Sequence, residues 1–94
     1  METAEKAWRP AASVIYSDLD DGAALLDTTK NVYYSLAGTG YFLWGELLKG
    51  ADFSALCSAL TGAFEVSPDV AEADVADWIS AMAGAGLIEE REHA

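Results

Sequence analysis

The chain has 94 residues, and a hydrophobic content of 52% with a single cysteine predicts one folded domain that needs no disulfide. Five Lys and Arg residues against sixteen Asp and Glu residues give a net charge of -11, which argues against nucleic acid as a partner because the phosphate backbone is also negative. No apolar run approaches the roughly 20 residues of a membrane-spanning helix, so we expect no membrane partner and a cytoplasmic location.

The N-terminal half has the pattern of an arm followed by a small sheet. Residues 1–9 are polar and charged apart from Ala4, Ala7 and Trp8, and Pro10 marks a boundary, which predicts a flexible N-terminal arm over 1–11. Weakly alternating segments at 12–17, 23–27 and 32–36 are separated by turns rich in Asp, Gly and Thr. These segments predict a three-stranded antiparallel meander, which needs a helical cover on one face.

The C-terminal half has the apolar spacing of three helices. The first runs over 39–48, the second begins after a capping Asp52, and the third begins at Ser67 and Pro68, which fit the N-cap and first helical positions. Gly84 and Gly86 end the third helix, and a charged tail follows at 91–94. We therefore expect an α+β fold of the winged helix-turn-helix type, with the sheet followed by three helices and the domain spanning 12–90.

Few residues are suited to catalysis or metal binding. His93 is the only histidine and lies in the tail, and Cys57 has the spacing of a small core residue. Asp18, Asp20 and Asp21 lack the spacing of a calcium loop and fit a solvated turn. The serines do not have the sequence context of an acyl carrier's attachment site. We expect a protein that is not an enzyme and that holds no cofactor and no metal.

An ordered set of short motifs resembles the PqqD-like proteins, also called RiPP recognition elements, which bind the leader segment of ribosomally made precursor peptides. The set comprises Leu25-Leu26-Asp27, Val32-Tyr33-Tyr34-Ser35-Leu36, Gly40, Leu43-Trp44, Leu47-Leu48, Asp74-Val75, Trp78-Ile79 and Gly86-Leu87-Ile88. The small acidic chain is most similar to the stand-alone leader-binding members of lasso-peptide pathways. One departure is Ala37, where the family often has a capping Asn, so the start of the first helix is displaced or is capped by Thr39.

The resemblance implies that a leader adds as an extra strand to the third strand of the meander and enters a groove beside the third helix. Of the two neighbouring tyrosines, at most one faces this groove, and Tyr34 and Val75 also fit the core. Asp74 or Asp77 is expected to meet a basic residue of the leader. The candidate peptide-binding residues are Val32, Tyr33, Tyr34, Ser35, Val70, Asp74, Val75, Asp77 and Trp78.

The partners that the resemblance implies are a precursor leader peptide and a leader peptidase or another modifying enzyme. The protein itself is expected to be a monomer or a weak dimer. The alternative is a winged-helix regulatory or protein-interaction domain without a leader ligand. A DNA-reading version is disfavoured because the third helix has Asp69, Glu72, Asp74 and Asp77 where a recognition helix has basic or amide side chains.

Overall fold

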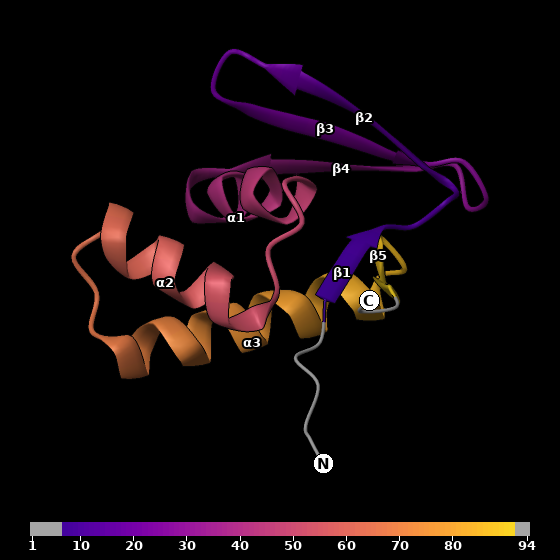
Figure 1. Ribbon diagram of the computed structural model, residues 1–94. Helices are drawn as coiled ribbons and strands as arrows, with labels where there is room; N and C mark the ends of the chain where they lie inside the picture. Colours follow the sequence, from indigo (N-terminus) through magenta and orange to yellow (C-terminus); the bar gives the residue numbers. More distant parts are fainter. Residues whose placement is uncertain (1–6, 92–94) are drawn as a thin grey trace.

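The computed structural model describes residues 7–91, and its main sheet is the expected meander. Strands β2 (Val14–Leu19), β3 (Gly22–Asp27) and β4 (Val32–Ala37) pair antiparallel in the order β2-β3-β4. Helices α1 (Gly38–Leu48), α2 (Phe53–Ala63) and α3 (Pro68–Gly84) follow and lie on one side of this sheet (Figure 1). The prediction of an α+β fold with three strands before three helices is confirmed.

Tight turns fix the register of the meander. A side chain on Gly22 would collide with the backbone carbonyl of Leu36 on the neighbouring strand, so this close pairing needs glycine. At the β3–β4 turn the Asp27 carboxylate accepts hydrogen bonds from the backbone N–H groups of Thr29 at 3.0 Å and Lys30 at 3.2 Å. Asp27 is only 2% exposed, and its hydrogen bonds offset the cost of burying it.

The helix starts agree with the sequence at two of three positions. Asp52 caps α2 by accepting from Ala55 N–H, and Ser67 caps α3 by accepting from Val70 N–H, with Pro68 next to it. For α1 the expected cap was wrong. The helix begins at Gly38, whose φ of 59° makes the sharp turn out of β4, and Thr39 lies inside the helix. Ala37 holds the N-cap position without a side-chain hydrogen bond.

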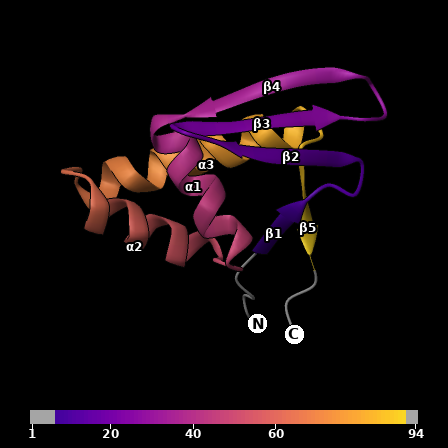
Figure 2. The ribbon, with the colours of Figure 1, turned by 90° about the horizontal axis from the view of Figure 1, so that it is seen from above.

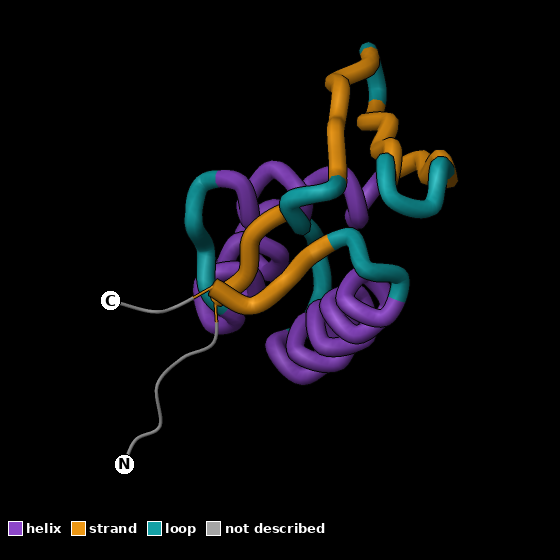
Figure 3. Tube along the Cα trace, turned by 90° about the vertical axis from the view of Figure 1, so that its right-hand side faces the viewer, coloured by secondary structure: helices purple, strands orange, loops and turns teal. Residues whose placement is uncertain are grey.

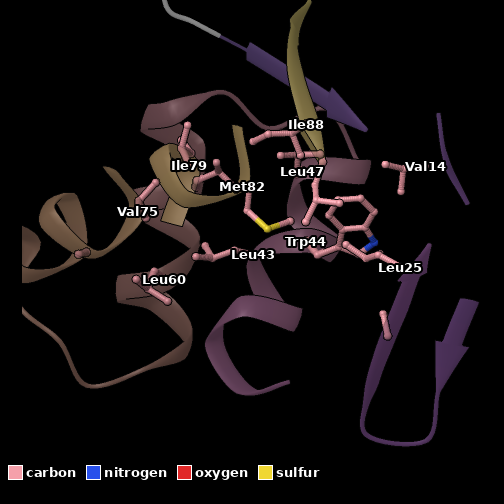
Figure 4. Close-up of a cluster of buried hydrophobic side chains, with 14 residues drawn as sticks. Val14, Leu25, Leu43, Trp44, Leu47, Leu60, Val75, Ile79, Met82 and Ile88 are labelled. Atoms are coloured by element: carbon pink, nitrogen blue, oxygen red, sulfur yellow. The ribbon is translucent and has the colours of Figure 1, made fainter. Parts of the chain in front are cut away.

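The core lies between the meander and the helices. Trp44 of α1 is 1% exposed and lies next to Leu25 of β3 and Leu47, while the ring of Tyr16 packs edge-on against it at 5.3 Å (Figure 4). Leu56 and Leu60 of α2 and Val75, Ile79 and Met82 of α3 complete the core. No helix in the described part of the chain is long and apolar enough to cross a membrane.

A second, two-stranded sheet was not predicted. Strand β1 (Ala7–Pro10) pairs antiparallel with β5 (Ile88–Arg91), and the two lie side by side near the chain ends (Figure 2). The end of the expected arm is therefore a strand, and Arg91, expected in the tail, belongs to β5. Residues 1–6 and 92–94, including His93, lie outside the described residues.

Burial and pairing explain why β1 forms. Ala7 is 1% exposed, and Trp8 packs against the core, so the segment gains apolar burial when it folds. The Arg9 guanidinium contacts the Glu89 carboxylate at 2.8 Å across the pair. Figure 3 shows this pair near the termini and apart from the meander. The strand's partner lies 80 residues away in sequence, beyond the reach of local patterns.

We predict that Asp27→Ala destabilises the protein by about 1–3 kcal/mol, because it leaves two backbone N–H groups of a tight turn without their acceptor. The measurement is the free energy of unfolding in urea. Asp27→Asn keeps an acceptor oxygen and should lose less, and Asp20→Ala in the exposed β2–β3 turn serves as the control. If the Asp27→Ala variant and the Asp20→Ala control had the same free energy of unfolding, the role assigned to Asp27 would be contradicted.

Candidate functional site

Strand β4 is an edge strand with one unpaired side. It pairs with β3 alone, and no other strand within residues 7–91 lies along its outer edge. Its sequence, Val32–Ala37, contains no charged residue and no proline, the residues that usually protect an exposed edge. The opposite edge strand, β2, carries Asp18 and leads into two further Asp residues. The β4 edge is therefore the better template for pairing with a foreign extended segment.

The side chains of β4 alternate between two faces. Tyr34 and Leu36 are partly buried against the core, in line with Tyr34 pairing opposite the buried Leu25. Tyr33 is 74% exposed and points to the opposite face of the sheet, together with Ser35. Of the two tyrosines, Tyr34 is thus the one on the helix side, where a peptide between β4 and α3 would lie.

Two observations place α3 close to the ends of β4. At one end, Lys30 Nζ in the β3–β4 turn donates to the carbonyl oxygen of Ala85, just after α3, at 3.3 Å. At the other end, a Cβ placed on Gly40 would stand 3.4 Å from Trp78 Nε1 and 3.9 Å from a methyl of Leu36. These contacts define the β4–α3 surface, which comprises residues 32–36 and the α3 flank from Trp78 to Ala85.

The predicted α3 residues fall at different places relative to this surface. Trp78 lies beside the end of β4, but Asp74 and Val70 lie about 6 and 12 Å further along the helix at 1.5 Å per residue, beyond Ala37. Both are exposed, so a peptide reaches them only by continuing past the strand. Asp77 lies about 100° around the helix from Trp78, on the exposed side.

Val75 requires a correction. Its side chain is 0% exposed and belongs to the core, so it does not line the β4–α3 surface. The sequence-based candidates also left out Leu36, Ala81 and Ala85, which this definition of the surface includes, and Lys30, which borders it. Spacing along α3 offered a signal, since Ala81 and Ala85 follow Trp78 by three and seven residues and share its flank.

The remaining chemistry of the described residues does not form a reactive site. Residues 7–91 contain no cluster of His, Cys, Asp and Glu arranged to hold a metal ion. The pKa of Tyr41 is raised above its ordinary value, because its hydroxyl donates to the Asp18 carboxylate at 3.2 Å and because the negative Asp18 disfavours the phenolate. This pair joins α1 to β2, which is the edge strand opposite β4 in the sheet.

Comparisons with known proteins agree with this geometry. A complex of TbiB1 with the TbiA(beta) leader peptide has a TM-score of 0.84 and 24% identity, covering 90% of this chain and 99% of the other. Lasso peptide synthetase B1 complexed with the leader peptide has a TM-score of 0.81 and 26% identity, covering 87% and 96%. A comparison with curated proteins found no match.

This chain thus shares its fold with both of these solved structures. The family described as Coenzyme PQQ synthesis protein D (PqqD) matches residues 22–88, so this chain belongs to the PqqD family. The resemblance inferred from the sequence motifs is confirmed. The match begins at the first residue of β3 and ends at the first residue of β5, so β1 and β2 precede the matched part.

Lys30 gives a testable account of how α3 is held next to the turn. The last turn of α3 contains no basic residue, so the Lys30 ammonium group is the cation that meets its carbonyl end. We predict that Lys30→Met lowers the free energy of unfolding by about 0.3–1 kcal/mol at low salt and by less at 1 M NaCl, where charges are screened. Lys30→Arg, which keeps a cation at this position, is the control and should lose less. A loss that does not change with salt would contradict this role.

Proposed function

We propose that this protein binds the leader segment of a ribosomally made precursor peptide and presents it to a leader peptidase of a lasso-peptide pathway. The observation that carries the proposal is the unpaired, uncharged β4 edge next to the Trp78 flank of α3. An extended leader pairs its main chain with β4, and its alternate side chains lie on the β4–α3 surface. Both structural neighbours were solved with a leader peptide, which supports the proposal.

In this proposal, binding of the leader and its cleavage are carried out by two different proteins. This protein then supplies the binding edge, and peptide-bond cleavage belongs to the partner enzyme. Precursor and adaptor meet in the cytoplasm, where the precursor is translated. A DNA-binding function is less favoured, because α3 exposes Asp69, Glu72, Asp74 and Asp77 and the chain has a net charge of -11.

Amide exchange tests strand addition directly. Neighbouring residues of an edge strand point their N–H groups to opposite sides, so every second amide of residues 32–37 should exchange rapidly in the free protein. We expect a short precursor gene beside the gene of this chain, and the ligand is a synthetic peptide with the leader sequence of that precursor. We expect saturable binding below about 10 μM, with the rapidly exchanging β4 amides slowed when the peptide is bound.

Two results would overturn the proposal. One is a free protein in which every β4 amide is already protected, because the edge would then be covered without a leader. The other is the absence of saturable binding at tens of micromolar peptide, measured by fluorescence polarisation with the full chain.

A substitution at Trp78 tests the helix side of the surface. Trp78→Ala removes the large aromatic group beside the end of β4 and should weaken leader binding at least about tenfold, the effect of losing a central aromatic contact. Trp8→Ala is a matched control, because Trp8 is also partly buried but packs at β1, away from β4. Circular dichroism must show that both variants are folded. Equal affinities of the two folded variants would contradict the assignment.

A further inference from the structure

A second candidate site lies on the side of α3 that faces α2, away from the β4–α3 surface. An open hollow of about 300 Å³ runs between α2 and the start of α3, a volume at the lower end of small-ligand sites. Six of its lining residues are Phe53, Ser54, Ser58, Thr61, Pro68 and Glu72. We call it the α2–α3 pocket. Glu72 marks the pocket on α3. At roughly 100° per residue, Glu72 and Asp74 point in directions about 160° apart around the helix axis.

We propose that the α2–α3 pocket receives a lysine or arginine side chain of a protein partner. Its walls combine apolar surface from Phe53 and Pro68 with oxygen atoms from hydroxyl groups and one carboxylate. This combination suits a long aliphatic stem that ends in a cation, because the stem packs on the apolar wall while the charged end meets acceptors. The site is independent of the leader-binding edge.

Among the described residues, 7–91, nothing pairs with the Glu72 carboxylate. A carboxylate stabilises the helix dipole when it lies in the first turn of a helix. Glu72 is the fifth residue of α3 and therefore lies past that turn. The residues four positions away are Pro68 and Ala76, so no ion pair forms along the helix. Within residues 7–91, no Lys or Arg contacts it. The Glu72 carboxylate is therefore available to a cation from outside.

The charge of the surroundings also favours a basic ligand. From residue 51 to the end, the chain contains nine acidic residues and a single basic one, Arg91. The Arg91 guanidinium donates to the carbonyl oxygen of Gly50 at 2.9 Å, and neither of these residues lines the pocket. A basic side chain that approaches the pocket thus meets a negative field, and none of the residues that line the pocket is Lys or Arg. Since the pocket and the β4 edge lie on opposite sides of α3, a partner here leaves the leader site open.

The test is an NMR titration of the full chain with N-acetylarginine amide, with N-acetylcitrulline amide as its uncharged isostere and N-acetylnorleucine amide as an apolar probe. We expect saturable shifts at residues 53–61 and 68–72 with the arginine probe, and an affinity at least about threefold weaker for the other two. Glu72→Gln should lower the arginine affinity by the same factor. Asp77→Asn removes the same charge from the exposed side of α3 and should leave it unchanged.

Three outcomes overturn the proposal: equal binding of all three probes, shifts spread evenly over the acidic residues of α3, or equal effects of Glu72→Gln and Asp77→Asn. Both substituted residues are exposed, so neither change is expected to unfold the protein. Leader affinity of the Glu72→Gln variant separates this proposal from the preceding one. It should equal that of the unsubstituted chain whether or not the pocket binds arginine.

Discussion

The structure depends on the burial of Trp44 beneath the meander. This side chain is 1% exposed and lies between Leu25 of β3, Tyr16 of β2 and the rest of α1. A three-stranded sheet of this size is not stable alone, so its attachment to α1 is what allows the meander to exist. Because α1 also packs with the other two helices through the core, Trp44 indirectly fixes where β4 lies relative to α3.

That fixed position matters because an exposed edge is normally a liability. Natural sheets protect their edges with charges, proline or covering segments, and β2 carries Asp18 accordingly. β4 has none of these, and its exposed Tyr33 and Val32 add apolar surface. An unprotected edge in a protein of net charge -11 is tolerable because like charges oppose self-association, while an uncharged or basic extended segment is admitted. The sequence thereby favours a foreign strand over a second copy.

Local patterns predicted most of the fold because they are carried by neighbouring residues. The hairpins follow from alternation and turn residues, and the starts of α2 and α3 follow from Asp52, Ser67 and Pro68, whose side chains or rings act within one turn. The pair β1–β5 could not be found this way, since its stability comes from Ala7 and Trp8 packing against residues at the far end of the chain. The start of α1 was misjudged because a glycine with positive φ replaced a side-chain cap.

The candidate site was only partly accessible for a related reason. The sequence and its family resemblance proposed the third strand and Trp78 as parts of the site, but where α3 passes β4 depends on tertiary packing, including the contact of Lys30 with Ala85. Those contacts lie at the C-terminal half of α3, so Asp74 and Val70 extend the surface beyond the strand instead of lining it. In the proposed binding mode, a peptide would have two distinct regions: main-chain hydrogen bonds along β4, which depend little on the peptide sequence, and side-chain contacts past Ala37, which depend on it more. Affinity is therefore expected to come mainly from the first region and selectivity from the second.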